Sequence, residues 1–313
     1  MKCLTIGILA HVDSGKTTLS EGLLYVSKMI RKMGRVDHKD AFLDTNEMER
    51  ERGITIFSKQ ARLTIPEKVK EGEKPEVDFT LLDTPGHVDF SAEMERTLSV
   101  LDYAILVVSG SEGVQSHTET LWKLLEHSHI PTMIFVNKMD IANDSQSQIM
   151  EQLQAKLNSS CIDFSNRDEN YFDALGSCDE ILMEQVLETG TANKTDIAKA
   201  ILQRHVFPCL FGSALKMDGV QEFWELLNEY TIPLENRPEF GAKVYKISED
   251  EQGKRLTHLK VTGGTYIEVP NDYRASQYDH TTDDYIKKKL YDRIYKLRDG
   301  TEVQRDWYSS FLL

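Results

Sequence analysis

One segment limits the possible fold of this chain more than any other: Ala10-His11-Val12-Asp13-Ser14-Gly15-Lys16-Thr17, called the phosphate loop below. It follows an apolar run, residues 4–10, and precedes a helical pattern at about residues 17–32. A Gly-Lys-Thr sequence between a strand and a helix is typical of loops whose backbone N–H groups cradle phosphates, aided by the helix N-terminus. The first position is usually glycine and here is alanine, and a chance match in a strand–turn–helix is the alternative.

The chemistry of this loop predicts two particular roles. The Lys16 ammonium would bridge the β- and γ-phosphates of a nucleotide, and the Thr17 hydroxyl would bind Mg²⁺. The predicted nucleotide-binding residues of this segment are Ala10, His11, Val12, Asp13, Ser14, Gly15, Lys16, Thr17 and Thr18.

Short apolar runs alternate with helical patterns over the first part of the chain. Residues 103–108 and 132–136 are almost continuously apolar, as strands of a parallel sheet covered on both faces are. Further strands are predicted at residues 79–83 and 207–211, and helices at 92–100, 116–127 and 220–230. We therefore predict an α/β fold: a P-loop domain with a mostly parallel sheet flanked by helices.

Three polar segments interrupt this alternation, and a different pattern follows it. We expect a long loop at residues 37–57, a solvated hairpin tip at 66–76, and an insertion over the sheet at 158–194. Residues 242–247 and 256–261 then alternate as antiparallel strands do, which predicts the start of a β-barrel. The predicted domains are residues 1–235, the start of a β-barrel at 236–265, and an atypical tail of uncertain fold at 266–313.

Composition restricts the partners. The 313 residues carry a net charge of −14, so bulk attraction to nucleic acid is excluded, and an RNA partner must be met through a local basic patch or through protein contacts. No apolar run approaches the roughly 20 residues that span a bilayer. The four cysteines form no CxxC pair, which favours reduced thiols. We expect a cytoplasmic monomer that binds neither DNA nor membrane.

A second motif, Asp83-Thr84-Pro85-Gly86, ends a predicted buried strand. Asp83 can hold Mg²⁺ through a water molecule, and the Gly86 N–H can contact a γ-phosphate. A DxxG sequence alone is common. Here an apolar strand delivers it to the carboxyl edge of the sheet, where ligands bind in open α/β folds.

Two further motifs predict which base is bound. Asn137-Lys138-Met139-Asp140 also ends a strand. The Asp140 carboxylate can accept from guanine N1–H and the 2-amino group, which adenine lacks, so adenine would leave it unpaired. The Lys138 stem can pack on the base, and Asn137 can tie this segment to the phosphate loop. After the last strand, Ser213 and Ala214, with Leu215 following, can offer a backbone N–H to guanine O6.

Two residues outside these motifs are candidates for catalysis. Thr55, in Gly53-Ile54-Thr55-Ile56, can bind Mg²⁺ only when a γ-phosphate is present, which would make its loop a switch. His87, directly after Gly86, can orient an attacking water. A surface threonine and a solvent-facing histidine are the alternatives.

Together the segments AHVDSGKTTL, RGITI, DTPGHVDF and NKMD resemble the motifs of translational GTPases, the elongation factor G superfamily. SVLDYAILVVSGSEGVQ and IPTMIFVNKMD resemble its tetracycline-resistance ribosomal protection subgroup, and the stretch between Asp140 and Ser213 is shorter than the insert usual in elongation factor G. The resemblance covers about residues 1–265.

This resemblance implies an enzyme that hydrolyses GTP to GDP and phosphate with Mg²⁺ and is stimulated by the ribosome. It implies that His87 positions the water and is engaged by ribosomal RNA, that Thr55 closes the first switch on Mg²⁺, and that Asp13 helps to hold a monovalent cation. With Lys16, His87 and Thr55 are the catalytic candidates, and Thr17, Thr55 and Asp83 the metal-binding ones.

The chain also departs from the family. Full members are much longer, and residues 266–313 do not resemble them. Two alternatives to a ribosomal GTPase therefore stay open: a truncated nucleotide-binding remnant without ribosomal function, and a GTP switch for a non-ribosomal partner. The choice between an elongation role and a drug-protection role is open as well.

Overall fold

The computed structural model describes residues 2–34, 59–64, 77–84, 91–167, 169–233, 239–249, 255–263, 278–279, 284–285, 294–297, 300 and 302–304. Contacts divide the chain into two units, and each is described by itself. The first comprises Met1–Glu235 and Lys243–Lys260, and the second comprises Asn236–Ala242 and Val261–Leu313. The domain limits expected from the sequence stay predictions.

The first unit is built on a seven-stranded sheet with the order β2-β3-β1-β4-β5-β7-β6. Its strands are β1 (Lys2–Ala10), β2 (Lys59–Thr64), β3 (Val77–Asp83), β4 (Tyr103–Ser109), β5 (Thr132–Asn137), β6 (Cys161–Asp163) and β7 (Phe207–Phe211). Neighbouring strands are parallel except β2 and β3, which pair antiparallel. The predicted fold class, a mostly parallel sheet of a P-loop domain, is confirmed.

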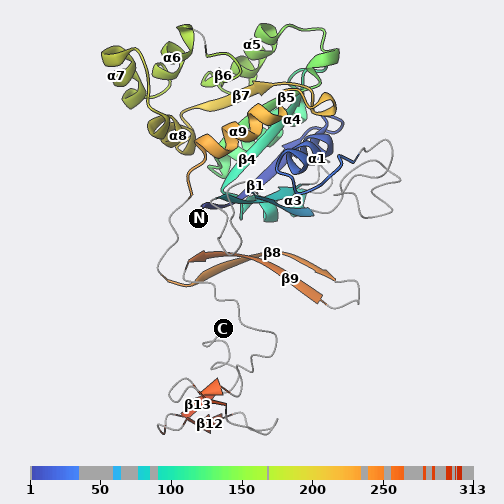
Figure 1. Ribbon diagram of the computed structural model, residues 1–313, viewed down its shortest axis with the longest axis vertical. Coiled ribbons are helices and arrows are strands. Elements are labelled where there is room, and N and C mark those ends of the chain that lie inside the picture. Colours follow the sequence, from blue (N-terminus) through green and yellow to red (C-terminus); the bar gives the residue numbers. More distant parts are fainter. Residues whose placement is uncertain are drawn as a thin grey trace. The chain divides into compact units, whose positions relative to one another are not determined.

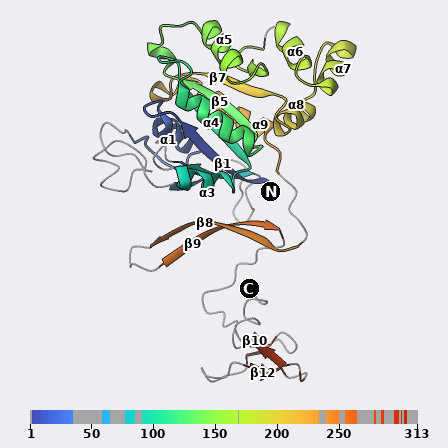
Figure 2. The same cartoon turned by 180° about the vertical axis from the view of Figure 1, so that it is seen from behind.

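Helices cover both faces of this sheet (Figures 1 and 2). The core on one face includes side chains of α1 (Lys16–Val26), α6 (Glu169–Gly176), α7 (Glu180–Thr189), α8 (Lys194–Leu202) and α9 (Val220–Tyr230), of which α7 packs on α6 and α8. The other packs on α3 (Ser91–Leu98), α4 (Ser116–His127) and α5 (Gln146–Lys156). Every residue of β4 and β5 is buried between the two layers, which is why their sequences are continuously apolar.

Two edge strands were absent from the predictions. In β2, Ala61 and Leu63 are buried while Gln60 and Arg62 are exposed, a short alternation that is hard to distinguish from a loop. At the other edge, β6 lies within the predicted insertion and pairs with β7. The segment 158–194 therefore extends the sheet and also contributes α6 and α7.

The first helix is shorter than predicted. The sequence pattern suggested a helix to residue 32, whereas α1 ends at Val26. Ser27 donates its N–H to the Leu23 carbonyl, and Lys28 then takes a left-handed backbone with φ 59°. This geometry stops the helical hydrogen-bond ladder, as is common at helix C-termini.

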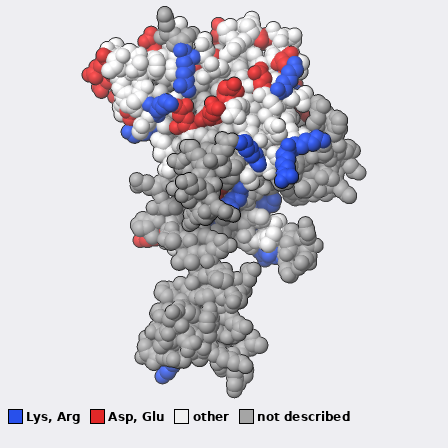
Figure 3. Space-filling model, viewed as in Figure 1, with Lys and Arg blue, Asp and Glu red and all other residues white. Residues whose placement is uncertain are grey.

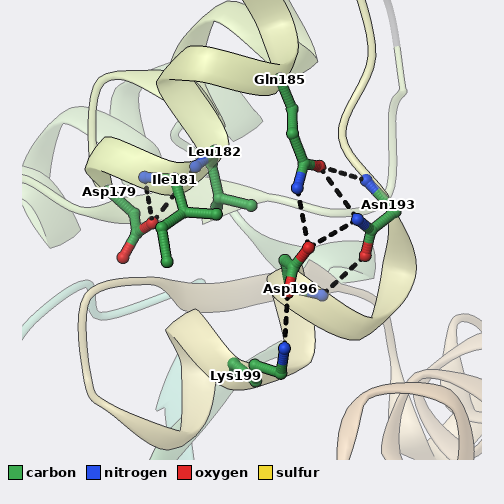
Figure 4. Close-up of polar contacts among 7 residues, drawn as sticks. All are labelled: Asp179, Ile181, Leu182, Gln185, Asn193, Asp196 and Lys199. Carbon is green, nitrogen blue, oxygen red and sulfur yellow. Dashed lines mark hydrogen bonds and ion pairs between the residues drawn. The ribbon is translucent and has the colours of Figure 1, made fainter.

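Polar side chains fix the ends of α7 and α8 (Figure 4). Asp179 accepts from the backbone N–H groups of Ile181 and Leu182 and so caps α7. Asn193 caps α8 by accepting from the N–H of Asp196. Gln185 of α7 donates to the Asp196 carboxylate, as does Lys199 within α8, and the two helices are thereby joined.

After these helices, β8 (Gly241–Glu249) and β9 (Arg255–Gly263) form a two-stranded sheet where the sequence predicts the first barrel strands. Within the first unit, Tyr245 of β8 is buried beside Leu82 and Val100, and its hydroxyl bonds Gln60 at 3.1 Å. Lys260 of β9 donates to the Asp102 carboxylate at 2.5 Å and to the Val100 carbonyl at 2.9 Å. The hairpin thus packs on the base of the sheet.

The described part of the tail contains only short strands. They are β10 (Tyr278–Asp279) paired with β11 (Asp284–Tyr285), and β12 (Ile294–Lys296) paired with β13 (Glu302–Gln304). The predicted loop at 37–57 and the hairpin tip at 66–76 lie outside the described residues. No helix within the described ranges is long and apolar enough to cross a membrane.

Candidate nucleotide-binding site

The phosphate loop connects β1 to α1 at the carboxyl edge of the sheet. Its backbone turns through left-handed conformations at Asp13, with φ 63°, and at Gly15, with φ 87°. A Cβ on Gly15 would lie 2.1 Å from Nδ2 of Asn137, so the site needs glycine for space as well as for conformation. Lys16 begins α1 directly after this turn, and Thr17 and Thr18 lie half-buried in its first turn.

Lys16 and Asp83 form an ion pair within this edge. Lys16 as a whole is only 8% exposed, and its ammonium donates to the fully buried Asp83 carboxylate at the end of β3. The next residue, Thr84, donates its hydroxyl to the Ile8 carbonyl of β1 at 2.7 Å. The pairing of β1 with β3 thus brings together the two motifs that the sequence assigns to phosphate and metal.

Asn137 joins the phosphate loop to the predicted base-binding residues. Its amide Nδ2 donates to the Ser14 carbonyl at 2.8 Å, and its Oδ1 accepts from the Ala214 N–H at 2.8 Å. The side chain is buried, with 3% of the residue exposed, so both bonds are protected from water. The Asn137 side chain therefore links its own segment both to the phosphate loop and to the segment after β7. The link to the phosphate loop is the contact that the sequence predicts for Asn137.

The predicted base-reading carboxylate belongs to a small polar cluster. Asp140 lies in the turn η4 (Met139–Ile141), which follows Lys138 in a left-handed conformation with φ 64°. The Ser213 hydroxyl, bonded to the carboxylate, holds the pKa of Asp140 below its usual value, and Lys216 adds to the effect. The Lys216 ammonium lies 3.2 Å from Oδ2 of Asp140. The carboxylate is therefore ionised at neutral pH and able to accept hydrogen bonds.

The second segment predicted to bind the base is a closed turn. Ser213 and Asp218 exchange backbone hydrogen bonds of 3.0 Å in both directions around η5 (Ala214–Lys216). Ala214 is buried, and Leu215 is 51% exposed. Sequence reasoning missed Lys216 and Asp218. The available signal was their place in the turn after Ser213, because a closed turn brings its last residues back beside its first.

Part of the predicted site cannot be placed. Gly53–Ile56, including Thr55, and Gly86 and His87 all lie outside the described residues. Among the described ones, the Thr17 hydroxyl and the Asp83 carboxylate offer the oxygen donors that Mg²⁺ prefers, at the edge where the phosphate loop ends. These two residues fit a magnesium site.

Comparison with known families shows what the chain is related to. The family described as elongation factor Tu GTP-binding domain matches residues 1–233. The chain belongs to this family. The resemblance that its motifs carry is thereby confirmed, and the matched domain is of the GTP-binding kind.

Proteins with known names agree with this membership. The chain is 33% identical to tetracycline resistance protein TetO of Campylobacter jejuni over 283 residues, which are 85% of this chain and 43% of TetO. It is 34% identical to TetW of Butyrivibrio fibrisolvens over 283 residues, with the same coverages, and 31% identical to TetP of Clostridium perfringens over 300 residues, 86% of this chain and 45% of TetP. The chain spans less than half the length of these relatives.

A solved structure of a Thermus thermophilus protein, ttk003000868, shares the fold. It aligns with a TM-score of 0.72 and 24% identity, covering 84% of this chain and 46% of that one. The named relatives confirm the expected likeness to the tetracycline-resistance subgroup, and this structure agrees with the predicted P-loop fold.

Proposed function

We propose that this translational GTPase binds GTP with Mg²⁺ and hydrolyses it to GDP and phosphate, and that the ribosome stimulates the reaction. The observation that carries the proposal is the pair of hydrogen bonds made by Asn137 to Ser14 and Ala214. They hold the segment proposed to bind phosphate and the segment proposed to bind the base at one edge of the sheet, as recognition of a whole nucleotide would require.

At the phosphate end, backbone N–H groups of residues 13–17 and the start of α1 would hold the phosphate chain. Lys16 would exchange its Asp83 partner for the β- and γ-phosphates. Thr17 and Thr55 would bind Mg²⁺ directly and Asp83 through water, and the bound ion would supply positive charge that offsets the charge developing on the phosphates.

At the base end, specificity for guanine would come from Asp140. An ionised carboxylate satisfies guanine N1–H and the 2-amino group, whereas adenine would leave it unpaired at a cost of about 1–3 kcal/mol. The Lys138 stem would pack on the base, and the Ala214 region would meet O6. In this scheme His87 orients the hydrolytic water and Thr55 senses the γ-phosphate.

The ribosome is the proposed partner because the named relatives are tetracycline resistance proteins and the family is one of translation factors. Charge limits where the contact can lie. Acidic side chains gather over α9 on the face drawn in Figure 3, where Glu222, Glu225 and Glu229 line a cavity of about 340 Å³. This acidic patch is unsuited to RNA, so ribosomal RNA would be met elsewhere on the molecule.

Turnover of GTP with and without ribosomes tests the proposal. We expect slow hydrolysis by the chain alone and a clear acceleration on ribosomes, with Mg²⁺ required for both. Labelled GDP should be displaced by GTP and not by ATP. Equal displacement by ATP would remove the base-reading argument. Nucleotide binding without hydrolysis would indicate a remnant, and hydrolysis unaffected by ribosomes would indicate a switch for another partner.

A further inference from the structure

Two histidine rings from distant parts of the chain meet beside the phosphate loop. Nδ1 of His11 lies 3.4 Å from Nδ1 of His117, with ring centroids 5.5 Å apart and ring planes at 71°. His11 is the second residue of the phosphate loop, and His117 is the second residue of α4. Both side chains are half-buried, so an ion from solvent can reach them.

The sheet fixes the spacing of these rings. His11 directly follows Ala10, the last residue of β1, which pairs with Val107 of β4. Helix α4 is anchored on the same sheet by Leu121, Trp122 and Leu125. The two histidines therefore extend from firmly packed elements, and their separation follows from the fold.

This separation suits a shared metal ion. Zinc–histidine bonds are about 2.0–2.1 Å long and tetrahedral, and two such bonds at roughly 109° place their nitrogens about 3.4 Å apart. We propose that Nδ1 of His11 and Nδ1 of His117 together bind a divalent transition-metal ion of the zinc class. In its absence, the same two nitrogens share one hydrogen bond, in which one ring donates and the other accepts.

The ligand type separates this site from the magnesium site. Imidazole nitrogen suits zinc, nickel and copper, whereas Mg²⁺ takes oxygen ligands. Within the described part of the chain, no group of three or more His, Cys, Asp or Glu side chains is arranged to hold an ion. Two protein ligands make a reversible site, in contrast to the closed four-ligand sites of structural zinc.

Binding at this place would have a consequence for the nucleotide. The ion would tie the phosphate loop to α4 and restrict the loop whose N–H groups hold the phosphates. We expect zinc to slow GDP release and GTP turnover. This consequence rests on the proposed function, whereas the metal binding itself does not.

Zinc titration of the full chain in competition with a chromogenic indicator tests the binding, with excess Mg²⁺ present and nucleotide removed. The variants are H117Q and, as a matched control, H127Q, which changes an exposed histidine on the same helix. We expect the wild-type chain and H127Q to bind one ion more than H117Q does, or to bind it at least tenfold more tightly. GDP binding by H117Q reports its folding, and H117N is a second variant for the same comparison.

Equal zinc binding by the wild-type chain, H117Q and H117N overturns the site, and so does the lack of zinc binding in all of them. Cobalt(II) gives a second readout, because nitrogen-bound tetrahedral cobalt absorbs in the visible range and this band should be lost in H117Q. If GTP hydrolysis is absent altogether, the proposed function fails while the zinc titration still decides the metal site.

Discussion

The side-chain amide of Asn137 donates a 2.8 Å hydrogen bond to the backbone carbonyl of Ser14, across 123 positions of sequence. Its other end receives the Ala214 N–H. Replacement by alanine would leave a buried carbonyl and a buried N–H without partners, at about 1–3 kcal/mol each. We expect N137A to weaken GDP binding by roughly 30-fold or more.

Fluorescence titration with a labelled GDP measures this effect. N143A, a change at an exposed asparagine in the loop before α5, serves as the control and should bind GDP as the wild-type chain does. Unchanged affinity in N137A would show that the bridge does not position the nucleotide.

Replacing a glycine can cost stability through backbone strain and through crowding of the new side chain, and Gly15 and Gly190 allow these two effects to be distinguished. Both have a left-handed backbone, with φ 87° and 73°, but a Cβ on Gly15 would lie 2.1 Å from Asn137, whereas one on Gly190 meets nothing within 4 Å. We expect G190A to lower the free energy of unfolding by about 1–2 kcal/mol and to leave GDP binding intact. G15A should cost more and abolish GDP binding. Urea unfolding and GDP titration of both variants check this, and nucleotide binding by G15A would contradict the proposed crowding.

Asp140 offers a test of base selection. In D140N the side-chain amide can donate to the 2-oxo group of xanthine, where the carboxylate accepts from the 2-amino group of guanine. We expect affinity for GDP to fall roughly 100-fold, by about 2–3 kcal/mol, and affinity for xanthosine diphosphate to rise. Competition between the two nucleotides provides the measurement. Preserved guanine selectivity would refute the role proposed for Asp140.

Acid should loosen α7 and α8 (Figure 4). Hydrogen bonds from Lys199, Gln185 and Asn193 lower the pKa of Asp196 to about 2. For Asp179, burial alone would raise the pKa, but the bonds from His205 and two backbone N–H groups outweigh it and the pKa is lowered. Because the folded pKa lies below the unfolded value of about 3.9, the stabilisation is present above that pH and is lost as the pH falls toward 2.

Amide hydrogen exchange of α7 and α8 between pH 5 and pH 2.5, corrected for intrinsic rates, measures this loss of protection. In D196N the same helices should show a weaker dependence on pH. Protection that is constant across this range in the wild-type chain would contradict the assignment.

Lys260 stabilises the packing of the β8–β9 hairpin on the sheet within the first unit. Its ammonium compensates the Asp102 carboxylate, which is only 7% exposed. We expect K260M to reduce the free energy of unfolding by about 1–3 kcal/mol, because a charge is left without its partner. K243M removes an exposed lysine whose bond goes to the Ser99 carbonyl, and it should have little effect. Urea unfolding of the full chain compares the two, and equal stability would argue against the ion pair.

The sequence predicted those parts of the fold that have strong periodicity. Residues 103–108 and 132–136 were identifiable because a strand covered on both faces must be apolar throughout. The edge strand β2 was missed, because Arg62 and Gln60 face outward and only Ala61 and Leu63 mark the buried side. The end of α1 was placed too late, because a left-handed Lys28 has no signature in the residue pattern.

Some residues of the candidate site could also be predicted from the sequence, and others could not. Asn137 and Asp140 could be predicted as site residues because the roles proposed for them depend on residue type at the end of a strand, and that order is visible in sequence. Lys216 and His117 were missed, since each acts through a partner that only the folded chain brings near: Asp140 at 3.2 Å and His11 at 3.4 Å. Their residue types alone would have suggested solvent-facing side chains.

The two hydrogen bonds that the Asp102 carboxylate accepts become possible at different stages of synthesis. Asp102 accepts the Thr5 N–H through one oxygen and the Lys260 ammonium through the other. During synthesis, the hydrogen bond from Thr5 can form once Asp102 has been made. The hydrogen bond from Lys260 can form only after 158 further residues have been added. Lys260 is therefore the last partner that Asp102 gains. The negative charge of this carboxylate stays uncompensated by Lys260 until synthesis has passed the second strand of the hairpin.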